Sequence, residues 1–146
     1  MDSLMRGRQS RERPGVGPVE QRLKAFRAVD AFVVEAYRLS TSLDGSQGRE
    51  LAREIRRAVS RCGGSLVASS AAKPSEDNER RSLELASMGL AEGRYYLYLA
   101  RRFGLLDLRR YRAIMTRQDA ARRELDQARA KASNDQTSVH QPPEVR

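Results

Sequence analysis

Apolar residues recur at intervals of three and four along most of this chain, which is the spacing of an amphipathic helix. Four segments show it, over about residues 19–42, 47–71, 75–104 and 107–132. Between them, no runs of β-branched residues alternate with polar ones, and no Asn-Gly or Asp-Gly turn joins two such runs. The pattern therefore predicts an all-α protein.

The apolar positions of each segment define the predicted core. In the third segment large residues alternate with small ones, which lets a neighbouring helix approach closely. The predicted stripes are Leu23, Phe26, Val29, Val33 and Tyr37 (widened by Phe32 and Ala36) in the first segment, Leu51, Ile55, Ala58, Val59, Cys62 and Leu66 in the second, Leu83, Ala86, Leu90, Gly93, Leu97 and Ala100 in the third, and Leu108, Tyr111, Ile114, Met115, Ala121, Leu125 and Ala128 in the fourth.

Local signals mark the ends of these helices. Ser75 and Asp107 are predicted N-caps, and Gly104 fits the left-handed conformation that stops a helix. Asp44-Gly45-Ser46 supplies turn residues after the first segment. Gly63-Gly64 falls inside the second pattern, where each glycine costs about 1 kcal/mol relative to alanine. This pair predicts a weak point, a kink or a close helix contact.

The connections between the helices are short, at about 43–47, 72–75 and 104–107. Short links between long helices make consecutive helices antiparallel neighbours. The sequence therefore predicts an antiparallel up-down-up-down four-helix bundle over residues 19–132.

The two ends of the chain lack helical periodicity. Residues 1–18 carry four arginines among glycines and prolines, and are predicted to form a disordered basic arm. Residues 133–146 are polar and contain two prolines, and are predicted to form a disordered tail.

Charge narrows the range of partners. The chain has 28 Lys and Arg against 19 Asp and Glu, a formal net charge of +9, and only three of its basic residues are lysines. A GC-rich genome replaces lysine by arginine but adds no charge. A positive field of this size favours polyanions, most often nucleic acid, and arginine forms bidentate pairs with phosphate.

Residue types that are rare or missing in the sequence argue against several other classes of protein. One cysteine (Cys62) and one histidine (His140) leave no disulfide framework or Cys-based zinc site, and nearly exclude a multi-His site or a His–Asp catalytic pair. No phosphate-binding glycine loop is present. The sequence has no apolar run of about 18 residues, the length that a membrane-spanning helix needs. The basic N-terminus also lacks the apolar core of a secretory signal. We therefore expect a cytoplasmic chain that is not an enzyme and has no cofactor, metal or small-molecule substrate.

Two sets of arginines are candidate phosphate contacts. Four in the second helix fall on one face, and those of the fourth helix outnumber its acidic residues. Such a stripe can track a phosphate backbone, whereas the competing interpretation is a solvated face held by Glu–Arg pairs within the helix. The candidates are Arg49, Arg53, Arg56, Arg57 and Arg61 in the second helix and Arg109, Arg110, Arg112 and Arg117 in the fourth.

The third helix adds two further candidates. Tyr95, Tyr96 and Tyr98 are interpreted either as a platform for unpaired bases or, more commonly for aromatics at helical spacing, as core or subunit interface. Glu92 has no second carboxylate or base at a useful spacing for catalysis. We expect it to pair with an arginine of a neighbouring helix.

The second and third helices also carry motifs found in a known family. The second reads Glu54-Ile-Arg-Arg-Ala58-Val-Ser60, and the third reads Leu90-Ala-Glu92 followed by Leu97-Tyr-Leu-Ala-Arg101-Arg-Phe-Gly104-Leu-Leu106. They resemble L-R-R-A-A-V-S and L-A-E…L-L-L-A-R-x-L-G-Y-L in a bacterial four-helix-bundle family. That family includes the proteins encoded in intervening sequences of large-subunit ribosomal RNA genes and the accessory variability determinants of diversity-generating retroelements. The resemblance covers about residues 22–127.

The resemblance implies a homopentamer, because members of the family form five-fold rings. It also implies RNA or DNA as a partner and, for a retroelement accessory protein, a reverse transcriptase. Together with the net charge, these implications predict an oligomeric adaptor that binds nucleic acid, with RNA expected before DNA. The alternative is a protein-interaction scaffold whose arginine-rich faces bind an acidic protein.

Overall fold

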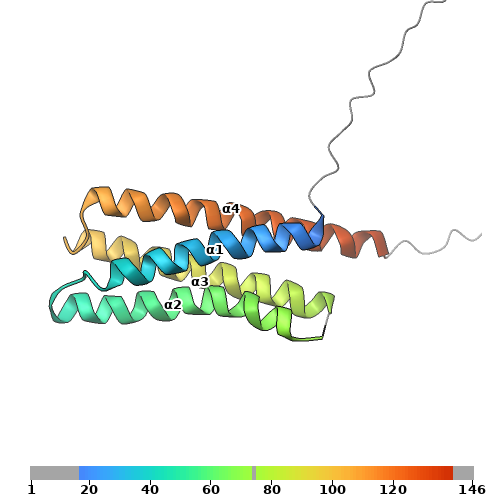
Figure 1. Cartoon of the computed structure of the whole chain (residues 1–146), viewed down its shortest axis with the longest axis horizontal. Coiled ribbons are helices and arrows are strands. Elements are labelled where there is room, and N and C mark those ends of the chain that lie inside the picture. The colour runs from blue at the N-terminus through green and yellow to red at the C-terminus, as the bar shows by residue number, and fades with distance from the viewer. Residues whose placement is uncertain (1–16, 74, 140–146) are drawn as a thin grey trace, which may run out of the picture.

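The computed structural model describes residues 17–73 and 75–139. They form four helices, α1 (Pro18–Ser40), α2 (Gly45–Ala71), α3 (Glu76–Arg102) and α4 (Leu108–Val139). Consecutive helices run antiparallel, and the α1–α2 and α3–α4 loops lie at the same end of the molecule (Figure 1). Helices α2 and α4 each pack against both α1 and α3. This arrangement confirms the predicted four-helix bundle. Among the described helices, none is both long enough and apolar enough to cross a membrane.

The predicted helix ends are confirmed at three places. The Ser75 hydroxyl accepts a hydrogen bond from the Asn78 amide at 3.1 Å, and the Asp107 carboxylate accepts one from the Arg110 amide at 2.8 Å. Both are N-cap bonds that satisfy an amide at the start of a helix. Gly104 has a φ of +71°, the left-handed conformation that ends α3.

The limits of the bundle differ from the prediction at both ends. Helix α1 begins at Pro18, inside the predicted arm, because proline suits the first turn of a helix. Helix α4 continues to Val139, so the prediction of a disordered tail is wrong for residues 133–139. This stretch has no proline or glycine, and extending a formed helix is easier than starting one. Residues 1–16 and 140–146 lie outside the described part of the chain.

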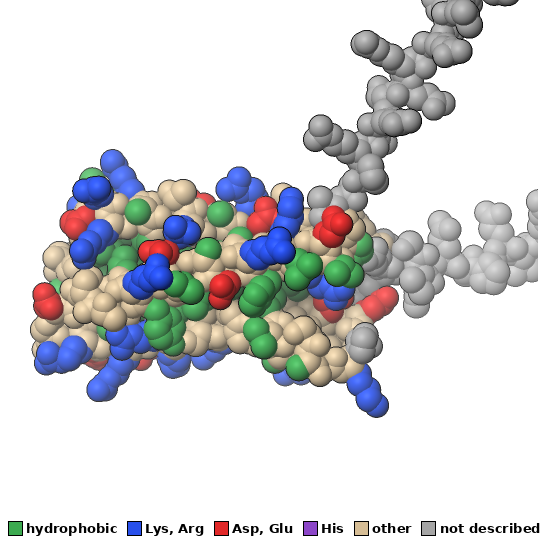
Figure 2. All heavy atoms as spheres, in the orientation of Figure 1, with side chains coloured by type: hydrophobic (Ala, Val, Ile, Leu, Met, Phe, Trp, Pro, Cys, Tyr) green, Lys and Arg blue, Asp and Glu red, His purple; other side chains and the backbone are tan. Residues whose placement is uncertain are grey.

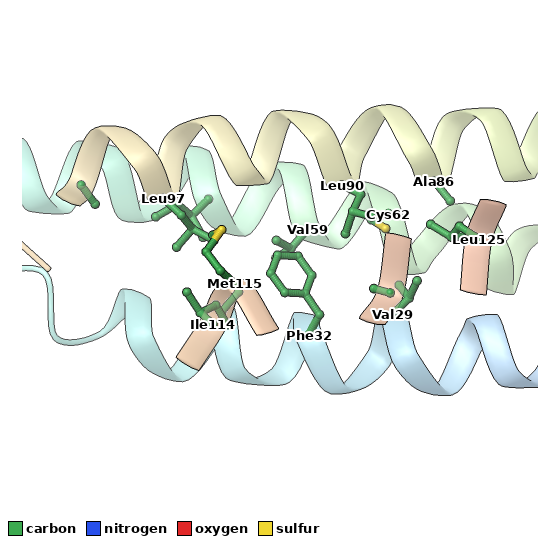
Figure 3. Packing of buried hydrophobic residues seen from close by; sticks show 14 of the residues in the cluster. Val29, Phe32, Val59, Cys62, Ala86, Leu90, Leu97, Ile114, Met115 and Leu125 are labelled. Atoms are coloured by element: carbon green, nitrogen blue, oxygen red, sulfur yellow. The ribbon is translucent and has the colours of Figure 1, made fainter. Parts of the chain in front are cut away.

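All four helices contribute to the core, and the predicted stripes of α2 and α3 agree best with it. Every predicted stripe residue of α3 is buried, and in α2 only Leu66 is partly exposed. Cys62 is fully buried among these residues, and its burial raises the pKa of the thiol to about 12. Figure 3 shows Phe32 pointing from α1 toward Val59 of α2 in the middle of this core.

Helix α1 is rotated from its predicted orientation. Its buried face holds Gln21, Ala25, Val29, Phe32, Ala36 and Ser40. The predicted core residues Leu23 and Tyr37 are instead 48% and 41% exposed. The polar Gln21 and Ser40 take core positions because each has a hydrogen-bond partner there. Leu108, at the start of α4, is likewise exposed and not in the core.

The rotation leaves an apolar groove between α1 and α2. Figure 2 shows hydrophobic side chains gathered along this junction. The groove has a volume of about 540 Å³, and its apolar lining includes Val19, Leu23, Phe26, Leu66 and Val67.

Helices α2 and α3 approach each other closely at Gly89. A Cβ atom added there would lie 2.8 Å from the Ala58 carbonyl oxygen and 2.9 Å from the Cys62 amide nitrogen. A glycine of α3 therefore makes a close helix contact. Helix α2 runs without interruption through Gly63 and Gly64, and a Cβ added at Gly64 would meet nothing within 4 Å.

Buried glutamines connect α4 to the rest of the bundle. The Gln21 amide group of α1 donates to a carboxylate oxygen of Glu124 at 2.9 Å. The Gln118 amide oxygen accepts from Arg94 at 2.7 Å, and its amide group donates to the Leu90 carbonyl at 3.4 Å. Buried polar groups with partners favour one register over others. These bonds fix how α4 lies against α1 and α3.

Candidate nucleic-acid interface

Positive charge is concentrated at the end of the bundle that carries the α1–α2 and α3–α4 loops. The name basic end is used below for residues 35–57 and 94–119, which are 49 of the 122 described residues; Glu92, which pairs with Arg57, lies just outside it. The basic end holds twelve arginines against six Asp and Glu, whereas the other described residues hold eleven Lys and Arg against ten Asp and Glu. Figure 2 shows Lys and Arg side chains along both long edges of the left half, where the loops lie. The net charge of the described bundle therefore comes almost entirely from one end.

The α2 arginines nearest the loop are the most available. Arg49 and Arg53 are exposed, and neither forms an ion pair in the described part of the chain. Arg56 is partly buried and donates from Nε to the Ser40 hydroxyl at 2.8 Å, which turns it toward the end of α1. Arg49, Arg53 and Arg56 therefore belong to one continuous stretch of α2 within the basic end.

Arg57 and Arg61 are in a different situation, because both pair with carboxylates. Arg57 binds Glu54 at 2.5 Å and Glu92 of α3 at 3.3 Å, and Arg61 binds the second oxygen of Glu92 at 3.2 Å. The hydrogen bond to Glu54 is the main cause that raises the pKa of Arg57. The expected pairing of Glu92 with a neighbouring helix is confirmed. For these two arginines the solvated, ion-paired face describes the structure better than a free phosphate contact.

Glu92→Gln is expected to strengthen anion binding. The substitution removes the only carboxylate that pairs with Arg61 among the described residues and one of the two that pair with Arg57. Arg61 is therefore released, Arg57 keeps its pair with Glu54, and the local charge rises by one. We expect two- to fivefold tighter binding of a labelled RNA at about 100 mM salt, measured by fluorescence anisotropy. Glu84→Gln is the matched control, because Glu84 is exposed and forms none of the ion pairs described. Equal effects of the two variants would mean that only net charge matters.

A second basic surface lies where α1 meets α4. Arg38, Arg110 and Arg117 line a groove of about 280 Å³ together with Glu35. Glu35 pairs with Arg38 at 3.1 Å, while Arg110 lies 3.8 Å from Asp107 and donates to the Ser42 hydroxyl at 3.1 Å. The groove has three guanidinium groups for one lining carboxylate, which suits an anionic ligand.

Sequence patterns did not single out Arg38. Its only local signal is a Glu three positions earlier, which is common on solvated helices. Arg38 becomes a candidate because the first helix, α1, packs against the last helix, α4, and this contact brings it to the same groove as Arg110 and Arg117. The remaining candidates, Arg109 and Arg112, are exposed on α4 and form no ion pair in the residues described.

The described residues lack a cluster of metal-ligating side chains. No group of three or more His, Cys, Asp or Glu side chains lies together there in a way that could hold a metal ion. Tyr96 is partly buried against the core and donates to Glu92 at 3.4 Å, and burial is the main cause that raises its pKa.

Comparison with known proteins does not name a family. No protein-family model matches this chain. A search of curated proteins also gives no match. The family resemblance of the second and third helices therefore rests on their motifs alone and stays a prediction.

Proposed function

We propose that this chain is a non-catalytic nucleic-acid-binding protein whose basic end contacts phosphates. The observation that carries this proposal is the uneven charge of the bundle, with twelve arginines against six carboxylates at the basic end and eleven Lys and Arg against ten carboxylates in the other described residues. Uniform solvation would not concentrate charge in this way. Five candidate arginines of the basic end are exposed and form no ion pair within residues 17–73 and 75–139: Arg49, Arg53, Arg109, Arg112 and Arg117.

Binding of this kind follows from electrostatics. Arginines that neutralise phosphates release condensed counterions, so affinity falls as salt rises. Contacts to phosphate position a protein but carry no sequence information. We therefore expect weak sequence selectivity, with RNA as the first ligand to test and DNA as the second.

The family resemblance extends the proposal to an oligomeric adaptor, a homopentamer that also binds a reverse transcriptase. The α1–α2 groove supports assembly, because Val19, Leu23 and Val67 are large apolar side chains exposed beside one another. A ring of bundles would repeat the basic end, and repeated weak sites raise the overall affinity. Light scattering of the purified protein measures the mass and tests this part separately.

The binding proposal is tested by fluorescence anisotropy with labelled RNA and DNA over a salt series. If three to five arginines contact a single strand, the logarithm of the affinity falls with the logarithm of the salt concentration with a slope of about −2 to −4 per protomer. Absence of binding to either nucleic acid at low salt contradicts the proposal. The remaining interpretation would then be a scaffold that uses the same arginines for an acidic protein.

A further inference from the structure

Exposed aromatic side chains share the basic end with the arginines. Of the eight Phe and Tyr in the described residues, four are exposed, and all four belong to the basic end: Tyr37, Tyr95, Tyr98 and Phe103. The last three come from the final two turns of α3 and its C-cap, and they are 56%, 42% and 51% exposed. Burial in the core does not account for these three side chains.

Two of these aromatics stand in line with an arginine. Tyr95 and Arg102 are seven residues apart and so lie on the same side of α3, with Tyr98 between them. The Arg102 guanidinium lies over the Tyr98 ring at 5.9 Å and donates to its hydroxyl at 3.4 Å. Seven residues span about 10 Å of helix, which is the length of about three bases stacked at 3.4 Å.

Arginines of α4 border this row. The ion pair between Arg94 and Asp119, at 2.9 Å, sets the register of the antiparallel helices α3 and α4. One heptad along from that pair, the antiparallel register makes Arg101 of α3 and Arg112 of α4 corresponding positions. Arg101 donates to the Leu106 carbonyl, and neither Arg101 nor Arg112 is paired with a carboxylate in the described part of the chain. The register therefore predicts positive charge on the α4 side of the aromatic row.

We infer that the C-terminal end of α3, with Tyr95, Tyr98, Arg102 and the C-cap residue Phe103, binds unpaired bases and makes the protein selective for single-stranded nucleic acid. The inference rests on the proposed function and specifies its ligand. Aromatic rings stack on bases that are not paired, while nearby arginines contact the phosphates. Paired bases in a duplex are stacked on one another and leave no ring face for Tyr95 or Tyr98. An apolar partner helix would match the rings but not the arginines around them.

The test compares a fluorescein-labelled 15-nucleotide RNA of mixed, non-self-complementary sequence with the same strand annealed to its complement. The wild-type protein is expected to bind the single strand at least tenfold more tightly than the duplex. The triple variant Tyr95→Leu/Tyr98→Leu/Phe103→Leu keeps apolar volume but removes the flat rings. It is expected to lose tenfold to 100-fold in single-strand affinity with less than a twofold change for the duplex.

Two controls separate stacking from other effects. Tyr37→Leu removes an exposed ring from the α1–α2 side of the same end, where the Tyr37 hydroxyl meets Ser60, and should leave single-strand binding within twofold. Tyr95→Phe/Tyr98→Phe keeps both rings and should retain the affinity. Circular dichroism verifies the fold of each variant. Tyrosine fluorescence gives an independent readout, because stacking should quench it in the wild type and less in the triple variant.

The outcomes distinguish this inference from the proposed function. Equal, salt-sensitive binding of single strand and duplex, unchanged in the triple variant, would overturn base stacking and keep phosphate binding. No binding of either probe would overturn both. A lower mass of the triple variant in light scattering, with unchanged single-strand binding, would show that the rings form an interface between copies and would also overturn the inference.

Discussion

Replacing four exposed arginines of the basic end by glutamine, Arg49→Gln/Arg53→Gln/Arg109→Gln/Arg112→Gln, is expected to weaken RNA binding about 100- to 1000-fold at 100 mM salt. Each phosphate contact contributes about 0.7 to 0.9 to the salt exponent, so four lost contacts remove roughly three orders of magnitude relative to 1 M salt. None of the four forms an ion pair in the described residues, so the fold should tolerate the change. Anisotropy titrations measure the affinity, and the salt slope should fall toward zero.

The chain offers a matched control for this variant. Arg27, Arg81, Arg123 and Arg129 are also exposed and form no ion pair with any described residue, but they lie outside the basic end. Their fourfold glutamine variant lowers the net charge by the same amount and should weaken binding less than tenfold. Equal losses in the two variants would mean that total charge, and not its position at one end, determines binding.

Gly89→Ala is expected to destabilise the bundle by about 2–3 kcal/mol. The added methyl group would lie 2.8 Å from the Ala58 carbonyl oxygen and 2.9 Å from the Cys62 amide nitrogen, and backbone atoms cannot move aside as a flexible side chain does. Separating α2 from α3 to make room loosens the most extensive helix contact of the bundle, and overpacking of this kind costs about 1–3 kcal/mol or more. Thermal or urea unfolding followed by circular dichroism measures the change in the free energy of unfolding. The melting temperature is expected to fall by roughly 10 °C.

Gly64→Ala is the control for helix propensity. Gly64 is exposed in the middle of α2, and a Cβ atom there meets nothing within 4 Å. Alanine should therefore stabilise the protein by about 0.5–1 kcal/mol. A Gly89→Ala variant as stable as the wild type would show that α2 and α3 can separate without loss.

The sequence predicted the fold well because helical spacing and short connections are local properties. The stripes of α2 and α3 are regular, and the structure buries them as expected. The stripe of α1 was correct at Val29, Phe32 and Ala36 but wrong at Leu23 and Tyr37. Apolar residues occur around much of that helix, and periodicity alone does not choose a face. The choice depends on Gln21 and Ser40, whose hydrogen bonds are known only once their neighbours are placed.

The candidate site was predicted less completely for a related reason. An arginine can be read as available only if no carboxylate of another helix lies beside it. Glu92 is 31 positions from Arg61 in the sequence, yet it pairs with both Arg57 and Arg61. Arg38 and Arg117 line one groove although 79 positions separate them. Local patterns indicate which residues carry charge, while the packing of the helices determines which charges remain free.

The bond between Gln21 and Glu124 has a consequence for the order of folding. These residues are 103 positions apart, so their contact closes nearly the whole described chain. The α2–α3 hairpin needs only a short loop closure, which costs less entropy and forms sooner. We therefore expect the docking of α1 on α4 to complete the bundle after the main barrier, so that weakening this bond speeds unfolding and leaves the folding rate almost unchanged. The lifetime of the folded protein, more than its rate of formation, is therefore set where its first and last helices meet.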